Sequence, residues 1–237
     1  MHIQVLSPHF DDASLSCGQH ILNWLSAGHD VEVVTVFTEF DAVTLSPDSQ
    51  EFMQKCGVKT GKEFHHLRGA EDKESLRQLG VKKFEWLGMT DGGFREKNGS
   101  PVYETHDLLF AGKVLDGSEW QEKVRKTLRS VTSQADIVVV PLGVGRHADH
   151  LLVRELLQQI VPKNQLLFYV DIPYAFQFSN WKLNQVVQCC TQPHSLVWPS
   201  SKKSKAVQAY TSQVPVLFLH GFWDYPEVVV GEGLRRL

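Results

Sequence analysis

Residues 3–38, "IQVLSPHFDDASLSCGQHILNWLSAGHDVEVVTVFT", indicate the fold class of this chain. A short apolar run at 3–7 precedes an amphipathic segment at 13–28, and a second apolar run follows at 30–38. The apolar runs are continuous rather than alternating in hydrophobicity, as in parallel strands that are covered on both faces. We therefore expect a strand, a helix and a second strand in one sheet.

The same alternation continues along the chain. Further strands are expected at 81–88, 136–143 and 165–176, the last with its exit loop, and further helices at 63–80, 118–135 and 148–161. The tail after Gln213 is apolar and aromatic, which favours a closing strand with surface loops. Strands and helices in this order predict a Rossmann-like, doubly wound α/β fold with a mostly parallel sheet and helices on both faces.

Length and composition narrow the class of protein. A chain of 237 residues, 42% of them hydrophobic, can form one domain with a sizeable core. The formal net charge is only −3 and no long block of like charge occurs, which argues against nucleic acid as a partner and against a polybasic membrane anchor. No signal peptide and no apolar run near the ~18 residues of a membrane span is evident, so we expect a soluble, cytoplasmic protein.

The four cysteines fit the same expectation. They form no C-x-x-C pair, which favours reduced thiols that pack as small apolar side chains. They are Cys17, Cys56, Cys189 and Cys190.

Residues 92–118 are polar, rich in glycine and without a clear period. A connection of this length inside a compact domain is usually functional. We expect it to form a variable insertion at the rim of a binding site.

Histidines and aspartates follow two of the expected strands. His9, Asp11 and Asp12 come after the first strand, and His147 and His150 come after the strand at 136–143. Ligands of open α/β sheets bind outside the carboxyl ends of the strands. The aspartates could also cap a helix, and the histidines could be polar residues of a first helical turn. Taken together, they offer three ligands that zinc accepts, with a carboxylate and an imidazole to spare.

Five ordered motifs resemble the PIG-L/LmbE-like zinc-dependent de-N-acetylases. "PHFDD" resembles the PHxDD signature of that family, and "HADH" resembles its second H-x-x-H motif. The other matches are Arg68, Glu71 and "LG" at 79–80, "LGMTDGG" at 87–93 and "KSKAVQAYTSQ" at 203–213. The resemblance implies a Rossmann-like fold and hydrolysis of an N-acetyl group from an N-acetylglucosamine-type amino sugar or its conjugate.

By position in those motifs, the resemblance implies a zinc ion, or another divalent metal, held by His9, Asp12 and His150. It makes Asp11 the general base and His147 the general acid. Asp149 is then a candidate to fix the tautomer of an imidazole, although it could also be an ordinary residue of a helix N-terminus.

Three further residues are candidates for substrate binding: Arg68, Asp91 and Tyr174. Their simpler interpretations are an ion pair of Arg68 with Glu71 or Asp72, a turn at Asp91, and a core or rim aromatic at Tyr174. Three residues near the C-terminus are expected to pack a helix against the site region rather than take part in the chemistry: Lys203, Tyr210 and Gln213.

One departure from the family pattern and several alternatives stay open. Phe10 stands where the family often has proline, which should affect the shape of the pocket more than the activity. A member of the same family could act on another acyl group or on a thiol conjugate. A non-catalytic sugar- or nucleotide-binding Rossmann-like protein is the other alternative, although the turn after the first strand lacks the G-x-G-x-x-G motif.

Overall fold

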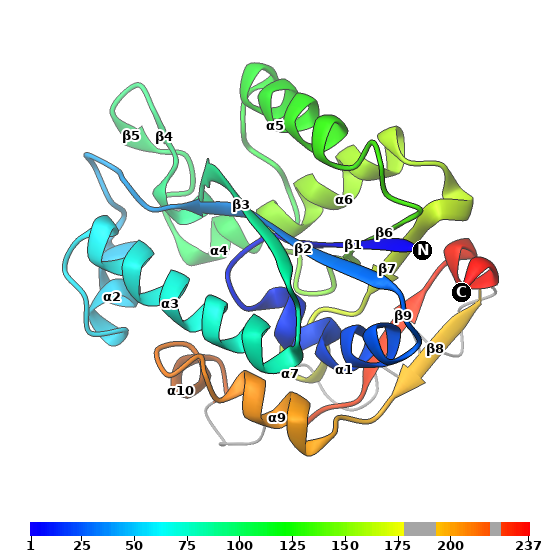
Figure 1. Cartoon of the computed structure of the whole chain (residues 1–237). Helices are drawn as coiled ribbons and strands as arrows, with labels where there is room; N and C mark the ends of the chain where they lie inside the picture. The colour runs from blue at the N-terminus through cyan, green and yellow to red at the C-terminus, as the bar shows by residue number, and fades with distance from the viewer. Residues whose placement is uncertain (178–192, 219–223) are drawn as a thin grey trace.

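The computed structural model of the chain describes residues 1–177, 193–218 and 224–237. Its main sheet has seven strands in the order β3-β2-β1-β6-β7-β9-β8 (Figure 1). The strands are β1 (His2–Ser7), β2 (Asp30–Glu39), β3 (Lys83–Thr90), β6 (Ile137–Pro141), β7 (Leu166–Tyr169), β8 (His194–Val197) and β9 (Glu227–Val230). The first five in chain order pair in parallel, whereas β9 is antiparallel to both β7 and β8. The expected mostly parallel sheet is confirmed.

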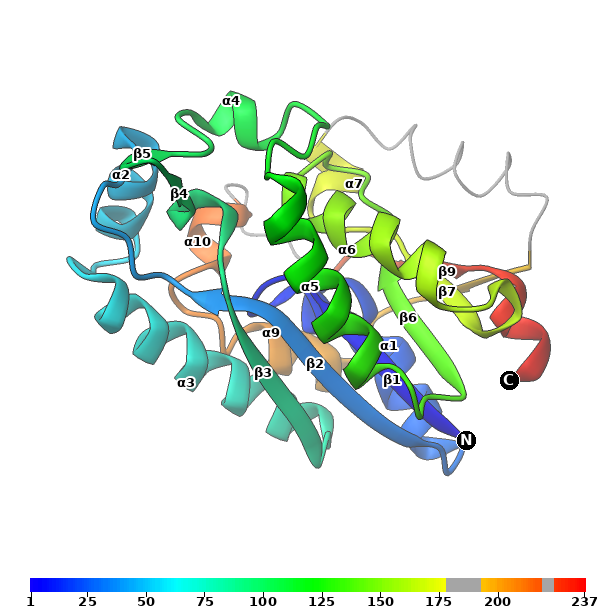
Figure 2. The same cartoon turned by 90° about the horizontal axis from the view of Figure 1, so that it is seen from above.

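Helices cover both faces of this sheet (Figures 1 and 2). One face carries α1 (Asp12–Ser26), α3 (Gly61–Leu79) and α9 (Ser201–Val207), and the other carries α5 (Ser118–Val131) and α6 (Ala148–Ile160). Successive strand side chains point to opposite faces, so Val5 packs with α1 and α3 while Leu6 packs with α5 and α6. Both residues are fully buried, as expected for a sheet between two helical layers.

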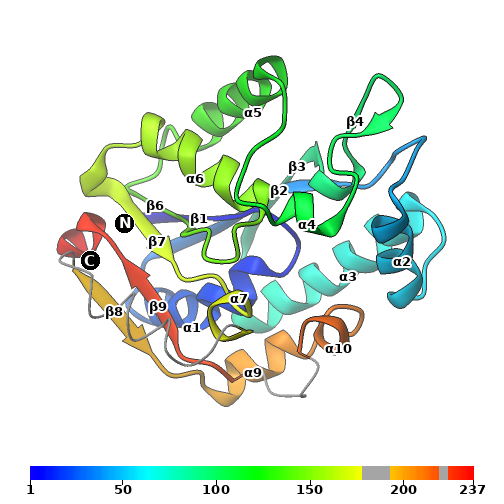
Figure 3. The same cartoon turned by 180° about the vertical axis from the view of Figure 1, so that it is seen from behind.

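The sheet reverses its winding between β1 and β6. These neighbouring strands pair in parallel, with Val5 opposite Val139. The chain leaves β1 into a helix on one face and leaves β6 into a helix on the other face (Figure 3). Such a switch point opens a crevice outside the carboxyl ends of the two strands, where ligands of this fold class bind. Both histidine-bearing motifs lie at this crevice.

Several boundaries differ from the sequence-based expectations. The stretch at 165–176 forms the expected strand and exit loop, since β7 ends at Tyr169 and a loop with a cis peptide between Ile172 and Pro173 follows, but it then leads into a short helix, α7 (Tyr174–Gln177). In the C-terminal tail, β9 is the expected strand, but it lies inside the sheet and β8 forms the edge.

Several short elements were not expected. Helix α2 (Pro47–Lys55) buries only Ser49 and Met53, so it has almost no apolar stripe, and it begins through the cap at Ser46. The segment 92–118 contains a two-stranded hairpin, β4 (Glu96–Lys97) and β5 (Ser100–Pro101), and α4 (His106–Leu109). Helix α10 (Val214–Leu217) follows Gln213.

Cys17 and Cys56 are buried and free, while Cys189 and Cys190 lie outside the described residues. None of the helices in the described ranges combines the length and the apolar character that a membrane crossing requires.

Candidate active site

The turn after β1 sends two adjacent carboxylates in different directions. Asp11 adopts a positive φ of 110°, unusual for a residue with a side chain. The carboxylate of Asp12 folds back and accepts a hydrogen bond of 2.8 Å from the backbone N–H of His9. Ser7 supports the same turn, because its hydroxyl donates to the carbonyl of His9 and accepts from the N–H of Ala13.

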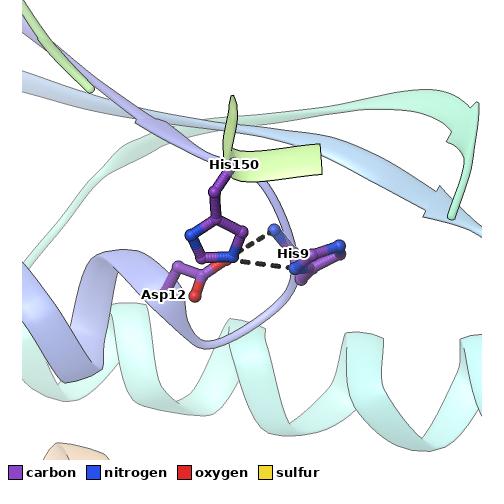
Figure 4. A group of neighbouring side chains, drawn as sticks. All are labelled: His9, Asp12 and His150. Atoms are coloured by element: carbon purple, nitrogen blue, oxygen red, sulfur yellow. Dashed lines mark hydrogen bonds and ion pairs between the residues drawn. The ribbon is translucent and has the colours of Figure 1, made fainter. Parts of the chain in front are cut away.

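Three side chains meet between the ends of β1 and β6: His9, Asp12 and His150 (Figure 4). Their ligand atoms all lie within 4.8 Å of one another, and each residue is at most 7% exposed. Oδ2 of Asp12 is 3.3 Å from Nδ1 of His9 and 3.3 Å from Nε2 of His150. Two imidazoles and one carboxylate are a donor set that zinc accepts while keeping a position open.

Asp171 orients His150. Its Oδ1 lies 2.6 Å from Nδ1 of His150, and its Oδ2 accepts hydrogen bonds from the N–H groups of Gly143 and Val144. An aspartate in this position makes Nδ1 the protonated nitrogen and leaves the lone pair on Nε2. Nε2 of His150 is buried and has no hydrogen-bond partner in the described part of the chain. A metal ion at Asp12 would satisfy it.

The charges around the histidines also favour a cation. Burial lowers the pKa of His9, but Asp91, Asp12 and Asp149 more than reverse this and raise it to about 9. Burial likewise opposes protonation of His150, yet Asp12 and Asp171 hold its pKa well above the usual range. Carboxylates thus attract positive charge to this position, which a divalent metal would supply while the histidines lose their protons.

Asp149 lies behind His9. Its Oδ2 is 3.0 Å from Nε2 of His9 and accepts a hydrogen bond from the N–H of Gly92. Its Oδ1 is 2.5 Å from Nη2 of Arg95. Although burial opposes ionisation, Arg95 and His9 hold the pKa of Asp149 far below its usual range. The structure therefore places Asp149 where it can fix an imidazole tautomer, and that imidazole is His9.

Asp11 stands beside the His9–Asp12–His150 group without joining it. Its Oδ2 accepts a hydrogen bond of 2.8 Å from Nη2 of Arg68, which also donates to the carbonyl of Phe10. The Asp11 side chain makes no capping hydrogen bond to α1, so the helix-cap interpretation does not describe its contacts. Burial raises the pKa of Asp11 to about 7 against the opposing effect of Arg68.

The partner of Arg68 is therefore not one of the acidic residues of its own helix. Glu71 instead accepts hydrogen bonds from Thr211 and Ser212, and Asp72 accepts from Trp86 and Tyr210.

His147 begins α6. Its Nδ1 accepts a hydrogen bond of 3.1 Å from the N–H of Asp149, so this nitrogen caps the N-terminus of the helix. Nε2 is left for the cavity, and the ring packs edge-on against Phe110. Burial, together with His9 and His150, holds the pKa of His147 well below its usual range, so the resting imidazole is neutral.

These side chains line a cavity of about 880 Å³, which is large enough for a small-molecule ligand. Arg68, Asp91 and Tyr174 also line it. Asp91 accepts a hydrogen bond from the N–H of Gly93, so the turn interpretation describes this residue as well. The segment 92–118 contributes Gly93, Phe94, Tyr103, Thr105, His106, Asp107, Leu109 and Phe110.

Close packing fixes one wall of the cavity. A Cβ atom at Gly145 would lie 2.4 Å from Cγ of Tyr174, so only glycine allows the ring of Tyr174 to pack there. Phe10 points away from the metal-ligand group into a cluster with Phe40 and Phe64.

Most of the C-terminal motif at 203–213 packs against neighbouring helices. Lys203 donates from Nζ to the carbonyl of Leu15, and Tyr210 donates to Asp72, so both join α9 and its exit turn to α1 and α3. Gln213 is buried and also lines the cavity.

Sequence reasoning missed two residues of this site. Asp171 follows β7, so the same rule about the carboxyl ends of strands could have found it. Arg95 lies in the irregular segment after β3, and no sequence pattern points to its contact with Asp149.

Comparisons with known proteins agree with this geometry. Residues 4–161 match the model of the PIG-L family, described as GlcNAc-PI de-N-acetylase. A 2'-N-acetylparomamine deacetylase of Niallia circulans is 30% identical over 188 residues, which cover 74% of this chain and 68% of that protein. A 2'-N-acetylparomamine deacetylase of Streptomyces fradiae is 32% identical over 177 residues, covering 73% of this chain and 57% of that protein.

Solved structures share the fold. A deacetylase from the biosynthesis pathway of teicoplanin superimposes with a TM-score of 0.75 at 22% identity, over 97% of both chains. N,N'-diacetylchitobiose deacetylase from Pyrococcus horikoshii gives a TM-score of 0.54 at 21% identity, over 100% of this chain and 85% of that one. Because the family model spans more than half of the chain and a relative reaches 30% identity, the chain belongs to the PIG-L family of de-N-acetylases.

Proposed function

We propose that the chain is a zinc-dependent hydrolase that removes the N-acetyl group from an amino sugar or its conjugate. One observation carries the proposal. The His9–Asp12–His150 group, through His9 and Asp12, and the carboxylate of Asp11 line the same cavity, and Asp11 lies beside the group without being part of it.

The metal would be held by Nδ1 of His9, Oδ2 of Asp12 and Nε2 of His150. When bound, zinc lowers the pKa of a coordinated water and polarises the carbonyl of the amide. The lone pair on Nε2 of His150 and the hydrogen bond behind it make these residues a fitting set.

Asp11 would act as the general base. It takes a proton from the attacking water, whose oxygen forms a bond to the carbonyl carbon of the acetyl group. A carboxylate with a pKa of about 7 is suited to this task, because a substantial fraction is ionised at neutral pH and the ionised form is basic enough to hold the proton. Arg68 fixes the direction of the carboxylate through its contact with Oδ2.

His147 would protonate the departing nitrogen through Nε2. The bond between the carbonyl carbon and the nitrogen breaks, and the products are acetate and a free amine. Because Nδ1 accepts the N–H of Asp149, the neutral ring carries its proton on Nε2, the nitrogen left for the cavity. The proton that Asp11 takes from the water replaces the one that His147 gives to the nitrogen, so the protons balance over one turnover.

The substrate is an acetylated amino sugar with a second ring or aglycone. The two curated relatives are named for deacetylation of N-acetylparomamine, and the cavity has room for more than one sugar ring. Arg68, Asp91 and Tyr174 would contact the sugar or its aglycone, and the middle of the segment 92–118 would form the variable rim.

Release of acetate tests the proposal. Metal-depleted protein, reloaded with one equivalent of zinc, is incubated with 2'-N-acetylparomamine and with N-acetylglucosamine, and acetate and primary amine are measured. With zinc-loaded protein we expect acetate and primary amine in equal amounts at least from 2'-N-acetylparomamine. With the metal-depleted protein we expect neither product. Zinc-loaded protein that binds these sugars without releasing acetate would instead indicate a sugar-binding relative.

A further inference from the structure

Two groups of ligands overlap at His9. Beside His9–Asp12–His150, a second group consists of His9, His147 and Asp149, whose ligand atoms also lie within 4.8 Å of one another. Figure 4 shows one ring nitrogen of His9 turned toward Asp12 and the other turned away. Nδ1 faces Asp12 at 3.3 Å, and Nε2 faces Asp149 at 3.0 Å and Asp91 at 3.4 Å. His9 can therefore serve one group or the other, depending on which nitrogen carries the proton.

Arg95 is placed to decide between them. Its side chain is buried, and its guanidinium is held between Asp149, at 2.5 Å from Nη2, and Asp116, at 2.8 Å from Nε. Nη1 also donates to the carbonyl of Thr90, and the ring of Phe37 lies 5.2 Å from the guanidinium carbon. These contacts fix the cation directly behind Asp149.

We propose that Arg95 is a positioning residue that directs the metal to His9–Asp12–His150 and keeps it out of His9–His147–Asp149. The inference rests on the metal site proposed above. Arg95 holds Oδ1 of Asp149, which turns Oδ2 toward Nε2 of His9 as a hydrogen-bond acceptor. The proton of His9 then sits on Nε2 and its lone pair on Nδ1, toward Asp12. A divalent ion on Asp149 would meet the charge of Arg95 at close range, which disfavours the second group.

This arrangement also protects His147. A metal in the second group would occupy the imidazole that is proposed to protonate the leaving nitrogen. Arg95 thereby separates metal binding from proton transfer in two histidines whose ring centroids are only 4.7 Å apart, His9 and His147.

Zinc binding to Arg95→Gln tests the inference without any need for turnover. Metal-depleted wild-type protein, Arg95→Gln and Arg95→Lys are titrated with zinc by calorimetry, and the bound metal is counted by mass spectrometry. We expect one zinc in the wild type. In Arg95→Gln we expect zinc to bind ten- to a hundredfold more weakly, a range typical for loss of such supporting contacts. The zinc should also be shared between the two groups, since His9 can serve only one of them at a time. Arg95→Lys, which keeps the charge, should bind one zinc with an intermediate affinity.

Two companion variants separate positioning from a general structural effect. Adding His147→Ala to Arg95→Gln removes the second group, so the affinity for zinc should fall below that of Arg95→Gln alone. Arg125→Gln, which removes an arginine on the surface of α5, should bind zinc like the wild type. If Arg95→Gln does not fold, Asp116→Asn loosens Arg95 without touching Asp149 and should weaken zinc binding in the same direction.

The possible results are distinguishable. A folded Arg95→Gln that binds one zinc with wild-type affinity overturns the inference and leaves the proposed function intact, as does wild-type affinity in Asp116→Asn when Arg95→Gln is unfolded. A wild type that binds no zinc contradicts the proposed function itself.

Discussion

Asp11 and Asp12 are neighbours in the chain with different surroundings. Asp12 faces two imidazoles, whereas Asp11 faces the guanidinium of Arg68. We expect Asp11→Asn to keep one equivalent of zinc and to lower kcat by about a hundredfold or more, because the amide cannot accept the proton of the attacking water. Zinc content and acetate release, measured on the same preparation, check this prediction.

Asp12→Asn is the matched control, since it makes the same aspartate-to-asparagine change at the neighbouring residue. It removes the only anionic ligand of the proposed site, so we expect the bound zinc to be lost together with activity. Full turnover in Asp11→Asn would show that another group is the base.

Asp171 acts on the metal site through His150. We expect Asp171→Ala to weaken zinc binding by about ten- to a hundredfold, because Nδ1 of His150 loses the acceptor that fixes the ring. Calorimetric titration with zinc measures the change. Asp136→Ala is a suitable control: Asp136 also accepts a backbone hydrogen bond, from His2, but at the opposite end of β6. Equal zinc affinity in wild type and Asp171→Ala would mean that His150 does not need this support.

Helix α3 connects the active site to the rest of the fold. It carries Arg68 toward Asp11, and one turn later its Asp72 accepts hydrogen bonds from Tyr210, beyond α9, and from Trp86 of β3. Asp72 is 2% exposed. The segment that orients the proposed base is therefore held by a buried carboxylate between two other elements.

Asp72 gives the stability of the protein a pH dependence. Burial raises the pKa of its carboxyl to about 6, above the value of about 3.9 in an unfolded chain. Between these values the folded protein binds the proton more tightly, so this contribution is complete below about pH 4 and is lost as the pH rises through about 6. We expect the free energy of unfolding of Asp72→Asn, relative to wild type, to increase by about 2–3 kcal/mol from pH 4 to pH 7.

Urea unfolding of both proteins at several pH values measures this difference. The other carboxyl groups titrate in both proteins and cancel, and the hydrogen bond that asparagine cannot make adds a constant cost at every pH. A difference that does not change with pH would contradict the raised pKa of Asp72.

Elements with a strong local signal could be predicted from the sequence. The continuous apolar runs of β1, β2 and β6 and the long periodic helices follow from local patterns, and Gly80 ends α3 with a positive φ of 89°. Helix α2 was missed because it buries almost no apolar surface. Its existence depends on a capping serine and on contacts with distant residues, such as the hydrogen bond from Ser49 to the carbonyl of Gly93.

At the scale of the whole molecule, the switch point between β1 and β6 explains why the two motifs meet. The sequence indicates strands that end in polar residues, and parallel neighbours must present those ends at one edge. No local sequence pattern predicts the order of strands in the sheet or the contact of Arg95 with Asp149. His9, Asp12, His150 and Asp149 were therefore within reach of sequence reasoning, whereas the contact of Arg95 with Asp149 required the fold.

The segment 92–118 serves two purposes in this arrangement. Its ends lie beneath the metal-ligand group: Gly92 and Arg95 contact Asp149, and Asp116 pairs with Arg95. Residues 105–110, in its middle, line the cavity through Thr105, His106, Asp107, Leu109 and Phe110. Only this middle part can vary without disturbing the ligands of the proposed metal.

Replacement of residues 105–110 by a Gly-Ser linker of equal length tests this division. We expect one equivalent of zinc to remain, because Gly92, Arg95 and Asp116 are unchanged. The ratio of kcat/KM for 2'-N-acetylparomamine to that for N-acetylglucosamine should change by about tenfold or more, since loops at the mouth of a rigid site determine which ligand fits. Deletion of the whole segment should instead weaken zinc binding at least as much as Arg95→Gln does, because it removes the cation behind Asp149. An unchanged ratio with zinc retained would assign substrate selection to the opposite wall, formed by Tyr174 against Gly145.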